Sequence, residues 1–140
     1  MADPGFALGK VSIVIAVWNG ERTLDRCLRS CEEQTYENKE IIVIDGASSD
    51  RTVDIIQRHV SCLAHWVSEP DSGIYSAWNK ALRVASGEWI CFLGADDVWA
   101  DSTSLALMMR SARRPAITFV SGRAQMVGGD GNLGRVVGGE

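Results

Sequence analysis

Long hydrophobic runs are missing from this sequence of 140 residues. Unbroken apolar runs, such as residues 13–18 and 41–44, are far too short to cross a bilayer, so we expect no transmembrane segment. The first five residues contain no basic region followed by an apolar stretch, and they therefore predict no secretory signal peptide. We accordingly expect a cytoplasmic protein, and the sequence leaves peripheral membrane association open.

The sequence also lacks an excess of positive charge and the cysteine spacings of metal sites. A net charge of −4 and a pI near 5.2 argue against nucleic-acid binding, which usually needs a basic face. The four cysteines fit neither a zinc ribbon nor a CxxC redox motif. Cys27 and Cys31 are spaced to share the buried face of a helix, so we expect reduced core cysteines there.

Three common motifs of nucleotide-binding proteins and hydrolases are absent as well. No G-x-G-x-x-G follows the first predicted strand, no phosphate-binding loop ends in G-K-S/T, and there is no G-x-S-x-G elbow. These absences argue against a dinucleotide-binding Rossmann domain, a P-loop protein and an α/β-hydrolase. A phosphoacceptor receiver domain would need acidic residues directly after the first strand, where this chain has Trp18 and Asn19.

Apolar strand-like segments alternate with segments of helical spacing, and they predict one α/β domain with a mainly parallel sheet built from right-handed βαβ units. Predicted strands span residues 10–17, 39–44, 63–68, 89–93 and 116–121. Predicted helices span residues 21–36 and 74–85, a third follows the N-cap candidates at residues 48–50, and a fourth ends near residue 110. Residues 128–132 predict the turn of a hairpin.

Two helix ends have recognisable capping signals. Gly87 follows the helix predicted at residues 74–85, where a left-handed C-cap is expected. Asp101 or Ser102 is expected to cap the start of the last helix.

Two adjacent carboxylates, Asp96 and Asp97, directly follow the fourth predicted strand. Because burying unpaired charge is costly, we expect the pair at the carboxyl end of the strand, where open α/β sheets bind ligands. Adjacent carboxylates repel each other unless a cation, a helix N-terminus or water offsets them. Oxygen ligands with room for water and phosphate suit Mg²⁺ or Mn²⁺. A solvated turn that caps the next helix explains the pair equally well.

Polar residues follow the other strands too. Trp18 and Asn19 follow the first, Asp45 follows the second, and Asp71 follows the third. Each group alone is compatible with ordinary turn chemistry. Because the carboxyl ends of parallel strands share one edge of the sheet, the four groups together favour a ligand site.

The segments that carry these groups resemble those of family 2 glycosyltransferases. The resemblance covers residues 10–122 and rests on VSIVIAVWNG at 11–20, IIVIDGASSDRT at 41–52, SEPDSGIYSAWNKA at 68–81 and GADD at 94–97. It implies the GT-A fold, which is a Rossmann-like, mainly parallel sheet flanked by helices. It also implies a nucleotide-sugar donor, a divalent Mn²⁺ or Mg²⁺ ion and inversion at the anomeric carbon.

The resemblance assigns roles to individual positions. Trp18 matches the aromatic residue that packs on the donor base, and Asp45 the carboxylate that helps to hold the base or ribose. Many relatives have a second Asp where this chain has Gly46, which leaves base selectivity open. Asp71 matches an acidic residue that lines the nucleotide pocket.

The carboxylate pair has a counterpart in the family as well. Asp96 and Asp97 match the metal-binding pair of the DxD-like motif, with Asp97 as the direct metal ligand. Many members begin that motif with Asp where this chain has Gly94, and the LGADD form is similar to that of a known subgroup. Tyr75 and Lys80 either approach the diphosphate or are solvated, and Trp78 is expected in the core.

We therefore expect residues 1–9 to be a tail, residues 10–122 a nucleotide-sugar-binding GT-A core and residues 123–140 a hairpin-like, incomplete C-terminal part. The expected function is transfer of a sugar, from a UDP-sugar in the commonest case, to a glycan or lipid-linked acceptor in surface polysaccharide or glycolipid synthesis. The family's general base lies on a later acidic motif, and no residue after Gly122 resembles it. The alternative is a non-catalytic or truncated module that binds nucleotide sugars.

Overall fold

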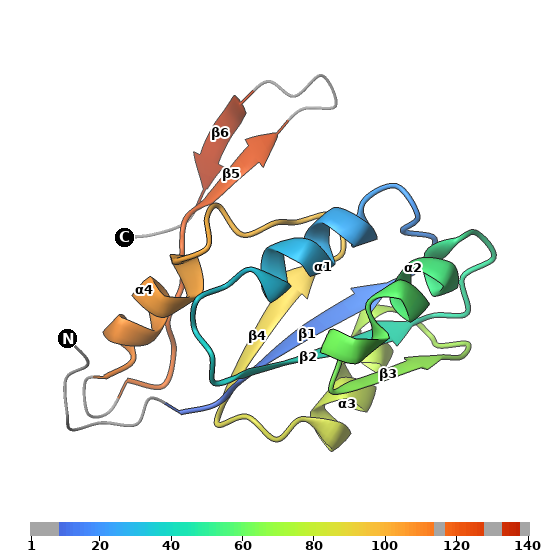
Figure 1. The fold of residues 1–140 in the computed structure, drawn as a ribbon, viewed down its shortest axis with the longest axis horizontal. Coiled ribbons are helices and arrows are strands. Elements are labelled where there is room, and N and C mark those ends of the chain that lie inside the picture. Colours follow the sequence, from blue (N-terminus) through green and yellow to red (C-terminus); the bar gives the residue numbers. More distant parts are fainter. Residues whose placement is uncertain (1–8, 114–116, 128–132, 138–140) are drawn as a thin grey trace.

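Four parallel strands form the central sheet of the computed structural model, which describes residues 9–113, 117–127 and 133–137 (Figure 1). The order across the sheet is β3-β2-β1-β4. These strands are β1 at Val11–Val17, β2 at Lys39–Asp45, β3 at His65–Ser68 and β4 at Trp89–Gly94. The predicted parallel α/β sheet is thus confirmed.

Helices cover both faces of this sheet and bury β1 and β2 between them. They are α1 at Leu24–Glu32, α2 at Thr52–Arg58, α3 at Ile74–Val84, α4 at Ser104–Ser111 and the short 3₁₀ helix η1 at Val60–Cys62. Side chains alternate along β1, so Ile13 and Ile15 pack with α1, α2 and α4, whereas Val14 packs with α3. The continuous apolar runs of β1 and β2 follow from this burial on both faces.

One of the two expected caps is wrong. α3 ends at Val84, the next residue Ala85 has extended backbone, and no left-handed φ occurs at Gly87. A Cβ at Gly87 would lie 2.5 Å from Ser12 Oγ and 2.6 Å from Ser12 N, so this glycine permits close packing against β1. At α4, the side chain of Asp101 does bind the start of the helix, because its Oδ1 accepts hydrogen bonds from Thr103 N–H at 2.8 Å and Thr103 Oγ1 at 2.7 Å. The buried Gln34 side chain also accepts a hydrogen bond from Leu105 N–H, at 2.9 Å.

The expected fifth strand at residues 116–121 is also wrong, since the described part of it, residues 117–121, has no strand assignment. A strand needs a partner for its backbone hydrogen bonds, and none of the described strands pairs with this segment. The predicted hairpin does form, from β5 at Ala124–Val127 and the antiparallel β6 at Leu133–Val137, and it projects from the sheet (Figure 1). Its expected turn at residues 128–132 lies outside the described residues. Within the described parts of the chain, no helix has the length and apolarity needed to span a membrane.

The amino-terminal edge of the sheet is closed by a hydrogen-bond network around Glu40. Its carboxylate accepts hydrogen bonds from Ser12 Oγ at 2.6 Å and Ser86 N–H at 2.7 Å, and it pairs with Lys10 Nζ at 2.8 Å. Burial of the carboxyl group opposes its ionisation, but the hydrogen bonds from Lys10, Ser12 and Ser86 outweigh this and lower the pKa of Glu40 to about 2. The network joins β1, β2 and the α3–β4 connection.

We predict that Glu40→Gln lowers the free energy of unfolding at pH 7 by on the order of 2 kcal/mol. Because the folded-state pKa lies below the ordinary value of 4.5, the contribution of this carboxylate is present above pH 4.5 and is lost as the pH falls toward 2. Urea unfolding at several pH values should therefore show a wild-type advantage that shrinks over this window. Glu37→Gln, which alters an exposed carboxylate of the segment before β2, is the control and should leave the free energy of unfolding at pH 7 unchanged.

Candidate functional site

Parallel pairing brings the four predicted polar groups to one edge of the sheet. In the register of the strands, Val17 lies opposite Asp45, Asp45 opposite Ser68, and Ala16 opposite Gly94. The loops that follow β3, β2, β1 and β4 therefore lie side by side, in that order. The expectation that these groups share the carboxyl edge is confirmed.

The loops after β1 and β2 are locked together by reciprocal hydrogen bonds. Asn19 N–H donates to Ser48 Oγ at 2.7 Å, and Ser49 N–H donates to Asn19 Oδ1 at 2.9 Å. Asn19 and Ala47 adopt left-handed backbone conformations with φ of 50° and 59°. Such conformations are costly for residues other than glycine, so the contacts between the loops must hold them. Trp18, directly before this lock, leaves 70% of its surface exposed at the sheet edge.

Asp45 differs from the other carboxylates of this edge because it is fully buried. Its Oδ2 accepts hydrogen bonds from Ser48 N–H at 3.0 Å and Ser68 Oγ at 2.6 Å, and its Oδ1 accepts one from Ser48 Oγ. Hydrogen bonds of this kind offset the cost of burying a carboxylate. Asp45 thus ties the ends of β2 and β3 together.

Asp71 lies in the loop after β3, with its carboxylate next to Gly46, and is half-buried. A Cβ at Gly46 would lie 3.0 Å from Asp71 Oδ2, so the glycine leaves space that the Asp71 carboxylate occupies. Asp71 Oδ1 accepts a hydrogen bond from the N–H of Gly73, whose φ of 121° requires glycine. At position 46, where many relatives have Asp, a side chain would therefore compete for the space that the Asp71 carboxylate fills.

Asp96 and Asp97 are exposed in a tight turn after β4, which is closed by Asp97 N–H donating to Gly94 O at 3.0 Å. A Cβ at Gly94 would lie 3.0 Å from Asp96 Oδ1 and 2.7 Å from Asp97 Oδ2. Both carboxylates therefore converge over the bare Cα of Gly94. Two exposed carboxylate oxygens close together, with open solvent beside them, fit Mg²⁺ or Mn²⁺. The described residues hold no group of three or more His, Cys, Asp or Glu suited to a metal, so other ligands would come from elsewhere.

The three side chains of α3 that the sequence singled out have different environments. Trp78 packs with the α3-side core, and its ring stacks on Phe92 with centroids 4.4 Å apart, which confirms the core prediction. Lys80 is held by Glu69 at 3.0 Å and by Pro70 O at 3.1 Å. Tyr75 is 75% exposed, and its ring makes a T-shaped contact with the Trp78 ring, with centroids 5.6 Å apart. The charge of Lys80 is therefore already paired by the loop that carries Asp71.

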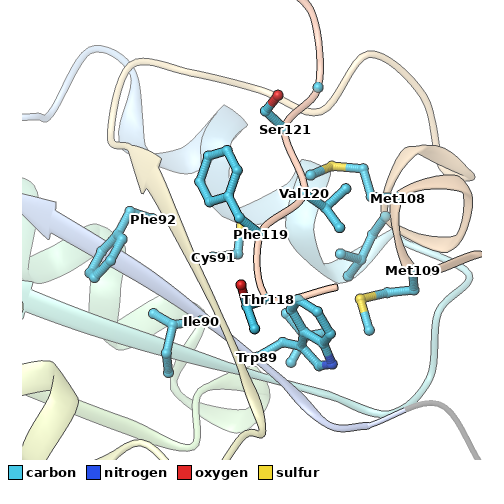
Figure 2. Close-up of a pocket in the computed structure, with 13 residues that line it drawn as sticks. Trp89, Ile90, Cys91, Phe92, Met108, Met109, Thr118, Phe119, Val120 and Ser121 are labelled. Carbon is cyan, nitrogen blue, oxygen red and sulfur yellow. The ribbon is translucent and has the colours of Figure 1, made fainter. Parts of the chain in front are cut away.

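A mainly apolar cavity of about 340 Å³ lies along β4, away from the carboxylate pair. Figure 2 shows Trp89 and Cys91 of β4 facing Met108 of α4 and the segment that contains Phe119. The residues that line it include no charged side chain. This cavity is thus unsuited to a charged ligand, and none of the predicted site residues lines it.

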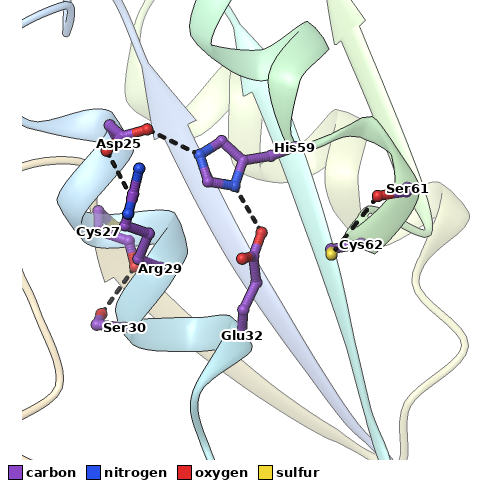
Figure 3. A network of polar contacts seen from close by, with 8 residues as sticks. All are labelled: Asp25, Cys27, Arg29, Ser30, Glu32, His59, Ser61 and Cys62. Atoms are coloured by element: carbon purple, nitrogen blue, oxygen red, sulfur yellow. Dashed lines mark hydrogen bonds and ion pairs between the residues drawn. The ribbon is translucent and has the colours of Figure 1, made fainter.

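α1 and the end of α2 are joined by His59, which lies between two carboxylates (Figure 3). Its Nε2 is 3.0 Å from Asp25 Oδ1 and its Nδ1 is 2.6 Å from Glu32 Oε1. Both ring nitrogens can donate to these oxygens only when the imidazole is protonated. The hydrogen bond from His59, followed by the pairing with Arg29, lowers the pKa of Asp25. These contacts of His59 fix α1 and α2, the helices that follow the loops of Trp18 and Asp45, relative to each other.

The sequence alone does not reveal two side chains that hold the site residues in place. It gives no sign that Ser68 bonds to Asp45, and it predicts only a core position for Cys27. The Cys27 thiol is indeed buried, but it also donates to Gly94 O at 3.4 Å. The spacing of Cys27, Ser30 and Gln34 along one side of α1 and its end is a signal that could have revealed this contact surface.

Comparison with known proteins identifies the family. The model of Glycosyl transferase family 2 matches residues 12–137. The chain is 36% identical over 109 residues to a PGL/p-HBAD biosynthesis glycosyltransferase of Mycobacterium bovis, covering 76% of this chain and 41% of that protein. It is 31% identical over 128 residues to the UDP-Glc:alpha-D-GlcNAc-diphosphoundecaprenol beta-1,3-glucosyltransferase WfgD of Escherichia coli, covering 91% and 50%. The chain belongs to glycosyltransferase family 2.

Solved structures agree on the GT-A fold. The mannosyltransferase PcManGT from Pyrobaculum calidifontis, in complex with GDP-Man and Mn²⁺, superposes with a TM-score of 0.74 at 28% identity, covering 79% of this chain and 34% of that one. S. aureus TarS 1-349 in complex with UDP-GlcNAc gives 0.63 at 25% identity, covering 74% and 30%. The chain thus spans no more than half the length of these relatives.

We predict that Asp45→Asn destabilises the fold by about 1–3 kcal/mol, because its amide NH₂ cannot accept the hydrogen bonds that a carboxylate oxygen accepts. Asp71→Asn, at the half-buried neighbour, should change stability by less than about 0.5 kcal/mol. Urea unfolding of both variants at pH 7 measures the difference. Equal effects would contradict the structural role of Asp45.

Proposed function

We propose that this chain is the donor-binding part of an inverting glycosyltransferase that uses a nucleotide-diphosphate sugar and a divalent metal ion. The observation that carries the proposal is the convergence of Asp96 and Asp97 over Gly94, at the sheet edge of a family 2 chain. Two similar structures support it, since one is a complex with GDP-Man and Mn²⁺ and the other a complex with UDP-GlcNAc. Transfer by the whole protein is part of the proposal.

Each residue at the edge has a proposed part in donor binding. The exposed indole of Trp18 offers a flat apolar face on which a nucleotide base packs. Asp71 lines the nucleotide pocket, and Asp45 helps to hold the base or ribose. Because both oxygens of Asp45 already accept hydrogen bonds from serines, it acts on the nucleotide in part by fixing the Ser48 and Ser68 hydroxyls.

Asp97, assisted by Asp96, is the proposed holder of Mn²⁺ or Mg²⁺. When bound, such an ion offsets the negative charge that grows on the departing nucleoside diphosphate. The two side chains supply oxygen ligands and keep them at the edge beside Trp18. A donor bound there would have its base near β1 and β2 and its diphosphate near the end of β4.

The acceptor side of the reaction needs a general base that takes the proton of the acceptor hydroxyl. The acidic residues that follow Gly122 in the sequence are Asp130 and Glu140, and both lie outside the described residues. We propose a glycan or lipid-linked acceptor, as the names of the mycobacterial and E. coli relatives suggest. The second candidate function, nucleotide-sugar binding without transfer, involves the same donor site and differs only in lacking this base.

The test is calorimetric titration of UDP and of GDP, each with and without Mn²⁺, into the wild-type chain and Asp97→Ala. We expect Mn²⁺ to lower the dissociation constant of at least one nucleotide. In the presence of Mn²⁺, Asp97→Ala should raise that dissociation constant about tenfold or more. Asp54→Ala, at an exposed carboxylate of α2, is the matched control and should bind as the wild type does. A folded wild-type chain that binds neither nucleotide would contradict the proposal.

A further inference from the structure

One side of α1 and its end hold the segment that connects β4 to α4, and this segment carries the carboxylate pair. Cys27 Sγ donates to Gly94 O at 3.4 Å, and Ser30 Oγ accepts from Trp99 N–H at 3.2 Å. Farther along, Gln34 Nε2 donates to Asp101 O at 2.7 Å. Asp96 and Asp97 therefore lie between the first two of these anchor points.

The anchor at Gly94 acts on the residue over which the carboxylates converge. The Gly94 carbonyl accepts hydrogen bonds from both the Cys27 thiol and Asp97 N–H, so one oxygen links α1 to the turn. The Cys27 side chain is fully buried, and burial favours the protonated thiol, which is the form that donates a hydrogen bond. Because Asp96 Oδ1 and Asp97 Oδ2 lie within 3.0 Å of the Cβ position of Gly94, a shift of this residue would disturb both carboxylates.

The second anchor acts through Ser30, whose hydroxyl bonds in two directions. Its Oγ donates to Cys27 O at 2.7 Å within α1, as Figure 3 shows, and accepts from Trp99 N–H. This bonding ties the far end of the turn to the same helical turn that carries Cys27. A side chain that only filled space in the core would need neither hydrogen bond.

We propose that Cys27 and Ser30 are positioning residues that fix the two ends of the 94–99 turn, so that Asp96 and Asp97 converge on a metal ion. The inference rests on the proposed function, because it concerns the same metal-dependent binding. It assigns the two side chains no contact with the nucleotide. Their loss should therefore weaken the effect of the metal and spare the affinity for the nucleotide alone.

The experiment measures the ratio of dissociation constants without and with Mn²⁺, for whichever of UDP and GDP the wild-type chain binds. We expect Cys27→Ala and Ser30→Ala each to reduce this ratio about threefold, the size expected for one weak hydrogen bond, with the metal-free constant unchanged. Cys27→Ser keeps a donor on the same carbon and should restore most of the ratio. Cys91→Ala removes a thiol from the same side of β4 without touching Gly94, and should leave the ratio as in the wild type.

Thermal unfolding of every variant separates positioning from stability. If Cys27→Ala does not fold, Ser30→Ala decides, because its side chain is only half-buried. An unchanged ratio in the folded variants, or an equal reduction in Cys91→Ala, would overturn the positioning role and leave the proposed function intact. A wild-type chain whose nucleotide binding does not respond to Mn²⁺ would overturn the metal-dependent function and this inference together.

Discussion

The whole arrangement depends on β1 being hydrogen-bonded on both sides by parallel strands. Pairing with β2 on one side and β4 on the other fixes the register of all the loops that follow. Because the strands are parallel, every loop that carries a polar side chain emerges at the same edge. Burial of Ile13, Val14 and Ile15 beneath helices on both faces holds this register, since a slip by one residue would exchange the two faces.

α1 connects the core to the site in three directions. Its apolar side packs on β1, Asp25 and Glu32 hold His59 at the end of α2, and Cys27 and Ser30 hold the turn after β4. The loop that precedes α1 is itself locked to the loop after β2. The position of one short helix thus sets the spacing between the loops after β1 and β2 and the carboxylate pair.

Local signals in the sequence were sufficient to predict most of the fold and the position of the site. Apolar runs predicted the buried strands, and the polar residues after each run predicted the edge, because both depend on neighbours in the chain. Contacts between distant residues could not be predicted in the same way. The cap of α4 by Gln34, the bond between Cys27 and Gly94, and the close approach of Ser12 to Gly87 each require the folded chain. The strand expected at 116–121 failed for the same reason, because β-forming residues do not supply a partner.

The carboxylates of this edge fall into two kinds, and their surroundings separate the two. Asp45 is buried, and serine hydroxyls and a backbone N–H donate hydrogen bonds to its oxygens. Its carboxylate therefore joins the ends of β2 and β3. Asp96 and Asp97 are exposed and converge where Gly94 has no side chain. The turn from residue 94 to residue 99 contains no cationic side chain that would pair with them. This turn is held to α1 by the hydrogen bonds of Cys27 and Ser30. Gly94 therefore has two roles: its missing side chain leaves room for both carboxylates, and its carbonyl accepts the hydrogen bond from Cys27 that holds the turn to α1.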